Sequence, residues 1–220
     1  MRGRQRVDER DRGLTLIELL VAISLLAIVA TLITTMVVSL SQNFSRQESQ
    51  QDSTNQAALA MQSVTRVIRA GTEIDTNGQR LAPVFTAAAP ESATMNTYVG
   101  VTSTADGPTR VTLAVNPKGE LVETRVASRK SGGVWVYSGA PSTSRVIARD
   151  VISAAPFTFL RADGTPLPAR ALTEAERYEI TAVQVRVTVQ THANSDASVA
   201  EMSSVVSLPN LDLTRMRTAP

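Results

Sequence analysis

The sequence predicts an α+β fold, in which one long N-terminal helix precedes a domain built on an antiparallel β-sheet. Residues 19–40 contain no charged side chain. No proline occurs before Pro83, and no glycine lies between Gly13 and Gly71, so nothing interrupts a helix over this stretch. Beyond residue 100, short alternating segments are separated by Gly, Pro and Ser, which is typical of strands and turns.

The apolar run is long enough to cross a membrane. A spanning helix needs roughly 20 apolar residues, and the apolar character already begins at Leu14. A secretory signal would be shorter and would end in small residues, unlike the sequence at 41–44. The arginines before the run favour a cytoplasmic N-terminus and place the rest of the chain outside. Hydropathy alone therefore indicates a signal-anchored single-pass protein.

The outer part of the helix has a different character. The uninterrupted stretch predicts a helix from Leu14 to about Ala70, with Gly71 as its C-terminal cap. Residues 41–71 are polar except for one stripe at helical spacing, which indicates an amphipathic half that packs on a sheet. The stripe consists of Ala57, Met61, Val64 and Ile68.

The domain at residues 72–208 is predicted to be β-rich. Residues 110–115 and 120–126 flank a turn at 116–119 and predict a hairpin. The clearest strand is 180–191, where valines alternate with polar residues. Further strands are expected at 133–137, 145–152, 157–161 and 202–208. Residues 72–97 and 162–178 resemble polar, Ala/Pro-rich connections, and 209–220 is expected to be a flexible tail.

Composition excludes several classes of function. Five of the 22 basic and three of the 20 acidic residues lie in residues 1–13, so 17 of each remain and the body is neutral. A neutral body argues against a large nucleic-acid footprint. The chain has no cysteine and one histidine, His192, which excludes thiolate and multi-histidine metal sites. No Gly-x-Ser-x-Gly motif occurs. We therefore expect no enzyme, no cofactor and no metal.

Two local clusters have both a functional and an ordinary interpretation. Asp163-Gly164 and the segment 194–196 could hold a calcium ion, but ordinary turns are favoured. Arg125, Arg129 and Lys130 could form a loop that contacts DNA, but a solvated basic loop is favoured.

Glu18 lies inside the apolar run. A carboxylate in the bilayer costs a few kcal/mol, so it usually marks a partner or a function. The alternative is a side chain that reaches back to the nearby interface. The residue on its own does not decide between them.

The sequence around Glu18 does decide. Arg-Gly-Leu-Thr-Leu-Ile-Glu-Leu-Leu-Val-Ala at 12–22 resembles the class III signal of type IV prepilins and pseudopilins. The resemblance implies that residues 1–13 are a cytoplasmic leader, which prepilin peptidase removes by cutting between Gly13 and Leu14. It also implies that Leu14 becomes an N-methylated terminus and that Glu18 pairs with a positive amine during assembly. The one departure is Leu14, where Phe is commonest.

The resemblance further implies a pilin-like fold, with residues 14–40 as the transmembrane and assembly helix, and a non-catalytic role in a filament. The expected partners are other minor pilins, the major pilin or pseudopilin and the cytoplasmic membrane, with DNA as a further candidate. Segments 146–152, 157–159, 163–164 and 203–210 resemble the J pseudopilin of type II secretion and PilW-like subunits. These segments favour a minor subunit. The rivals are a signal-anchored adhesive or binding domain and a membrane-tethered hydrolase.

Overall fold

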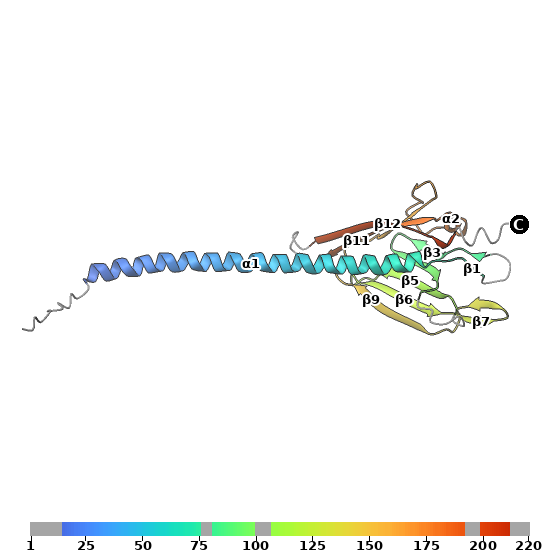
Figure 1. Cartoon of the computed structure of the whole chain (residues 1–220), viewed down its shortest axis with the longest axis horizontal. Coiled ribbons are helices and arrows are strands. Elements are labelled where there is room, and N and C mark those ends of the chain that lie inside the picture. The colour runs from blue at the N-terminus through green and yellow to red at the C-terminus, as the bar shows by residue number, and fades with distance from the viewer. Residues whose placement is uncertain (1–14, 76–80, 100–106, 192–198, 212–220) are drawn as a thin grey trace, which may run out of the picture. The chain divides into compact units, whose positions relative to one another are not determined.

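The structure is a computed structural model that describes residues 15–75, 81–99, 107–191 and 199–211. It forms two compact units, residues 1–47 and 48–220. The first helix, α1 (Leu16–Arg69), contributes to both of them. The expected α+β fold, a long N-terminal helix followed by antiparallel sheets, is confirmed (Figure 1).

The second unit contains all the described strands and one short helix, α2 (Glu174–Tyr178). In chain order the strands are β1 (Ile74–Asp75), β2 (Leu81–Ala82), β3 (Phe85–Ala89), β4 (Ser92–Thr97), β5 (Thr109–Val115), β6 (Leu121–Ala127), β7 (Arg129–Ser131), β8 (Val134–Val136), β9 (Ser142–Ala148), β10 (Phe157–Leu160), β11 (Ala182–Gln190) and β12 (Val199–Ser207).

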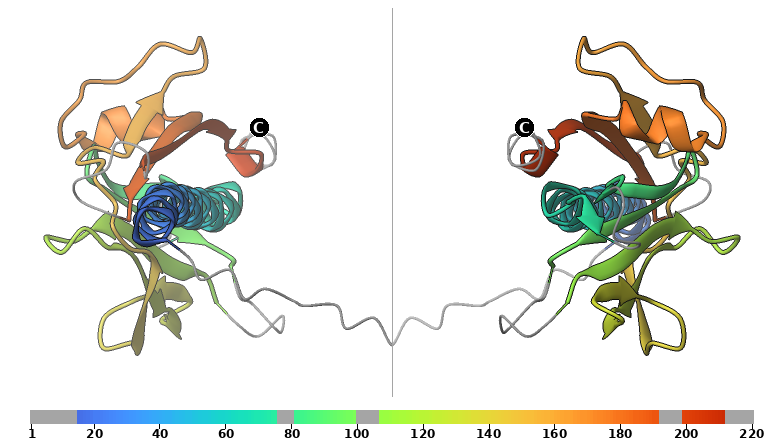
Figure 2. Two further views of the ribbon diagram at one scale, coloured as in Figure 1. Left: turned by 90° about the vertical axis from the view of Figure 1, so that its left-hand side faces the viewer. Right: turned by 90° about the vertical axis from the view of Figure 1, so that its right-hand side faces the viewer.

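The strands form two main antiparallel sheets. One has the order β3-β4-β5-β6-β9 and the other the order β10-β11-β12, while β1-β2 and β7-β8 are separate pairs. Residues 48–69 of α1 lie between the two main sheets (Figure 2). The sheets are also joined directly, because the rings of Phe85 on β3 and Phe159 on β10 meet edge to face with centroids 5.3 Å apart.

The predicted stripe on the outer helix is confirmed. Ala57, Val64 and Ile68 are fully buried, and Met61 is partly buried against the same core. Ala60 and Val67 widen the buried face. Two alanines on this face bring the helix backbone close to the sheets. The packing of this half of α1 thus follows from its amphipathic pattern.

The strongest strand prediction is also confirmed. Val183, Val185, Val187 and Val189 of β11 are fully buried, while the residues between them are more exposed. The predicted hairpin joins β5 to β6. Within the turn of this hairpin, the Asn116 side chain accepts hydrogen bonds from the Lys118 and Glu120 backbone amides at 2.9 Å each.

The prediction that residues 72–97 form a connection is wrong. Strands β1 to β4 lie there, and β3 and β4 complete one side of the five-stranded sheet. These strands are rich in alanine and show no clear alternation of apolar and polar residues, so their local preference for a strand is weak. Ala88, Ala93 and Met95 are nevertheless buried. Tertiary packing therefore outweighs the local signal.

The proposed mechanism of the helix end is wrong as well. Gly71 does not adopt the left-handed conformation of a glycine cap. A Cβ at this position would lie 2.7 Å from Val84 Cγ1 and 2.9 Å from the Ile68 carbonyl oxygen. Glycine is thus required because the chain passes close to its own core.

Strand β9 ends four residues earlier than predicted. Asp150 has a φ of 55° and turns the chain away from the five-stranded sheet. The next residues reach the other sheet, where the Ile152 amide donates to the Thr188 carbonyl oxygen at 2.9 Å. The apolar run 145–152 therefore serves two sheets in succession.

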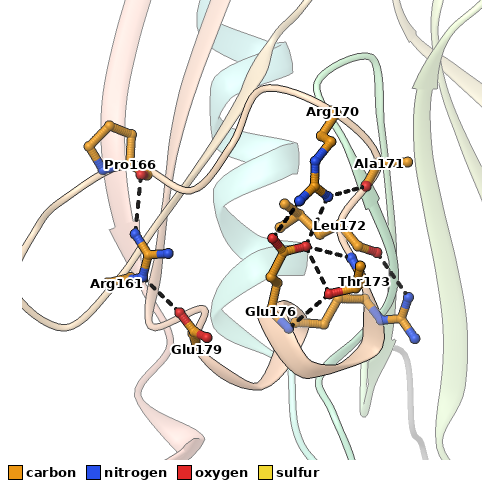
Figure 3. A network of polar contacts seen from close by, with 9 residues as sticks. Arg161, Pro166, Arg170, Ala171, Leu172, Thr173, Glu176 and Glu179 are labelled. Carbon is orange, nitrogen blue, oxygen red and sulfur yellow. Dashed lines mark hydrogen bonds and ion pairs between the residues drawn. The ribbon is translucent and has the colours of Figure 1, made fainter.

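Residues 162–178 were predicted to be a connection, but they contain α2 (Figure 3). Thr173 and Glu176 form a capping box, in which each side chain accepts a hydrogen bond from the backbone amide of the other residue. Arg170 binds the Glu176 carboxylate with two nitrogens, at 2.9 and 2.7 Å. The Arg170 guanidinium and the Thr173 donors together lower the pKa of Glu176 to about 2.

The beginning of the predicted tail contacts the end of α1. Asn210 Nδ2 donates to the carbonyl oxygens of Arg69 and Gly71, at 3.3 and 3.1 Å, and Leu211 is buried.

Candidate processing and assembly site

The candidate site lies at the start of α1. Gly13 and Leu14, the predicted cleavage and methylation positions, lie outside the described residues, as does His192. Glu18 is described, and it lies in the first turn of the helix. Of the three predicted positions of the signal, Gly13, Leu14 and Glu18, the structure therefore describes only Glu18.

Glu18 closes a capping box with Thr15. Its Oε2 accepts from the Thr15 backbone amide at 2.9 Å and from the Thr15 hydroxyl at 3.0 Å. The Glu18 amide in turn donates to Thr15 Oγ1 at 3.3 Å. Each bond satisfies a polar group that the helix start leaves open. The carboxylate is thus held beside the peptide nitrogen that follows Leu14.

The role of Thr15 was not predicted, although the Thr-x-x-Glu spacing is typical of a capping box. The capping box at α2 offers a comparison within the same chain. There the carboxylate has the same two threonine donors and, in addition, the Arg170 cation (Figure 3). Within the described residues, Glu18 has the threonine donors without a cation.

The helix beyond Glu18 is suited to an apolar medium. All described residues from 15 to 47 are exposed, including large aliphatic side chains. Four hydroxyls of this segment donate to carbonyl oxygens three or four residues earlier in the helix, at 2.8 to 2.9 Å. These hydroxyls belong to Ser24, Thr31, Thr34 and Thr35. They need no outside partner, so lipid or other apolar helices can cover this surface.

The part of the chain that the structure describes has one helix long and apolar enough to span a membrane, and this helix is α1.

The other clusters singled out in the sequence do not form a common site. Asp163 accepts from the amide and hydroxyl of Thr165, at 2.9 and 2.7 Å, which lowers the pKa of the Asp163 carboxyl and makes an ordinary turn. Segment 194–196 lies outside the described residues. In the described ranges, no three His, Cys, Asp or Glu residues are grouped as metal ligands.

The basic loop is divided between two elements. Arg129 and Lys130 lie on the exposed strand β7, with Lys130 Nζ 5.8 Å from the centre of the Trp135 ring. Arg125 lies on β6 and pairs with the buried carboxylate of Glu123. Arg125 is therefore engaged in an ion pair within the domain, whereas Arg129 and Lys130 lie on an exposed strand.

Residues 9–34 match the family model of the prokaryotic N-terminal methylation motif. The match contains Gly13, Leu14 and Glu18, and it extends through most of the apolar segment. No curated protein and no solved structure matches the chain significantly. The chain thus carries a type IV prepilin-like signal, and the motif supports a pilin- or pseudopilin-like protein.

The motif and the single apolar helix together fit a membrane protein anchored at its N-terminus. A signal of this type generally implies processing by a prepilin peptidase and assembly with other pilins.

Proposed function

We propose that this chain is a minor pilin or pseudopilin, a non-catalytic subunit that helps to start or cap a type IV pilus-like filament. The observation that carries the proposal is the match of residues 9–34 to the methylation motif, on a helix whose apolar part is exposed throughout. Prepilin peptidase cuts between Gly13 and Leu14, and the new Leu14 amine is methylated. The anchored chain has its N-terminus in the cytoplasm and its β-rich domain outside.

The geometry at Thr15 holds the Glu18 carboxylate where it can take part in assembly. Cleavage leaves a positive amine on Leu14, one residue before the amide that Glu18 already binds. Two opposite charges attract strongly in a low dielectric. The same carboxylate can exchange its Thr15 contacts for the amine of a neighbouring subunit. This exchange sets the axial position of one helix against the next.

Two features favour a minor rather than a major subunit. Major pilins often have a proline about twenty residues into the helix, and α1 has none up to Arg69. The C-terminal segments also resemble those of J-type and PilW-like subunits.

The competing proposal is a signal-anchored surface domain with a binding role. Such a protein needs the apolar helix, but it needs neither Gly13 at this spacing nor an ionisable Glu18. The capping box with Thr15 uses Glu18 in either case, so it does not separate the proposals.

Deletion of the gene and quantification of subunits test the minor role. We expect a strong reduction in the number of filaments per cell, because a subunit that starts assembly acts once per filament. Quantitative proteomics of sheared filaments is expected to find the chain far below one copy per major subunit. Equal or higher abundance than every other filament subunit contradicts the minor role.

A further inference from the structure

A groove runs along the second unit between residues 59–66 of α1 and strand β9. It consists of two cavities of about 340 and 320 Å³ that share Arg66 and Arg145. The larger cavity adds the aliphatic side chains of Leu59, Val146 and Ile147, and the smaller adds Glu123 and Arg125. The aliphatic side chains define the apolar half of the groove, which also contains Arg66 and Arg145, and Glu123 and Arg125 define the charged half.

The charged half contains more cations than anions. Arg66, Arg125 and Arg145 line it together with one carboxylate, that of Glu123. Glu123 is fully buried and receives hydrogen bonds from both Arg125 and Arg145, the latter at 2.6 Å. Arg66 forms no ion pair with any described residue. The pocket therefore has an excess of two positive charges.

The buried carboxylate fixes the guanidinium groups in place. Arg145 donates to Glu123 and also to Ser63 Oγ on α1 at 2.9 Å, so it is held from both sides of the groove. An arginine fork held in this way has N–H groups left for a further acceptor, and its planar geometry suits a carboxylate. Because the donors are already oriented, a ligand loses less entropy on binding.

Helix-end electrostatics explain only part of this arrangement. Arg66 and Arg69 lie in the last turn of α1, where cations are favourable. That effect does not account for Arg125 and Arg145, which come from β6 and β9 and converge on the same cavity.

The apolar half of the groove favours a protein side chain over a free inorganic anion as the ligand. Leu59 is 61% exposed and Val146 is 41% exposed, so both present aliphatic surface next to the cations. A free inorganic anion would use only the charged half. A protein side chain can place its carboxylate on the arginines and its neighbours on Leu59 and Val146. Strand β9 adds an edge, since it pairs only with β6 in the described part of the sheet.

We propose that this groove receives an Asp or Glu side chain from a neighbouring subunit of the filament, seated on Arg66, Arg125 and Arg145. The proposal rests on the proposed function and adds a contact in the β-rich domain to the helix contact at Glu18. Removal of one arginine from such a hydrogen-bonded charge contact is expected mainly to speed dissociation of the neighbouring subunit.

Carbodiimide coupling tests this contact in assembled native filaments. An Arg66→Lys variant places a primary amine in the groove, and the natural sequence has only Lys118 and Lys130 as lysines. Carbodiimide joins an amine to a carboxylate only when the two touch. We expect mass spectrometry to find the introduced amine joined to an Asp or Glu of another subunit, whereas Lys130, exposed on β7, serves as the internal control.

An additional Arg125→Gln substitution is expected to lower the yield of this crosslink by roughly tenfold, because the carboxylate loses one of its donors. Isotopic labelling of half the chains separates a second copy from the same chain. Two results overturn the groove proposal but not the proposed function. One is a crosslink that forms only to Glu123 of the same chain, and the other is the absence of any crosslink in chains that carry methyl-Leu14. Chains that retain Met1 or Arg2 overturn the proposed function and this contact with it.

Discussion

A Glu18→Val variant is expected to insert into the membrane normally and to be lost from assembled filaments. Insertion does not suffer, because the change removes a charge from an apolar segment. Assembly suffers, because the Leu14 amine of the neighbouring subunit loses its counter-charge. Breaking a desolvated ion pair costs roughly 3–5 kcal/mol, so incorporation is expected to fall by at least about 100-fold and by up to about 1,000-fold or more.

The measurement is the ratio of the variant in the sheared filament fraction to the variant in the membrane fraction. Glu48→Val is the matched control, since Glu48 is an exposed carboxylate on the same helix beyond the apolar run. We expect this control to incorporate like the natural chain. Equal recovery of Glu18→Val and Glu48→Val in filaments would refute charge pairing as the assembly mechanism.

Replacement of Phe85 by alanine is expected to cause a large loss of stability. Phe85 is fully buried and meets Phe159 edge to face, so it joins the two main sheets. Truncation of a buried phenylalanine lowers the free energy of unfolding by about 3–5 kcal/mol. At roughly 2–4 °C per kcal/mol for a chain of this size, the melting temperature is expected to fall by about 6–20 °C.

Thermal unfolding of the full chain in detergent micelles measures this effect. Val205→Ala is the control, because Val205 lies on β12 with 56% of its surface exposed. Such a surface change is expected to alter the free energy of unfolding by no more than about 0.5 kcal/mol. Similar melting temperatures for the two variants would mean that Phe85 does not join the sheets.

Local sequence patterns are sufficient to predict the long helix and the clearest strand. An uninterrupted run without glycine or proline predicts α1, and strict alternation of valine predicts β11. Strands β3 and β4 carry no such pattern, because their alanine-rich segments become strands through pairing in the five-stranded sheet and burial in its core. The end of β9 depends on the left-handed Asp150, which no local periodicity indicates.

The residues of the candidate sites also differ in whether a local sequence motif predicts them. Gly13, Leu14 and Glu18 lie within six residues, so a local motif predicts them without any knowledge of the fold. The partner of Glu18, Thr15, is equally local and was available from its spacing. The arginine groove is different, because its cations come from α1, β6 and β9 and meet only in the folded domain.

The most direct test of the account is the N-terminal mass of the protein purified from its native membrane. The account predicts a chain that begins at Leu14 with a methyl group on its amine, because prepilin processing removes residues 1–13. Peptide mass spectrometry distinguishes this end from all others. A chain that begins at Met1 or Arg2 would contradict the pilin assignment and leave α1 as a simple anchor.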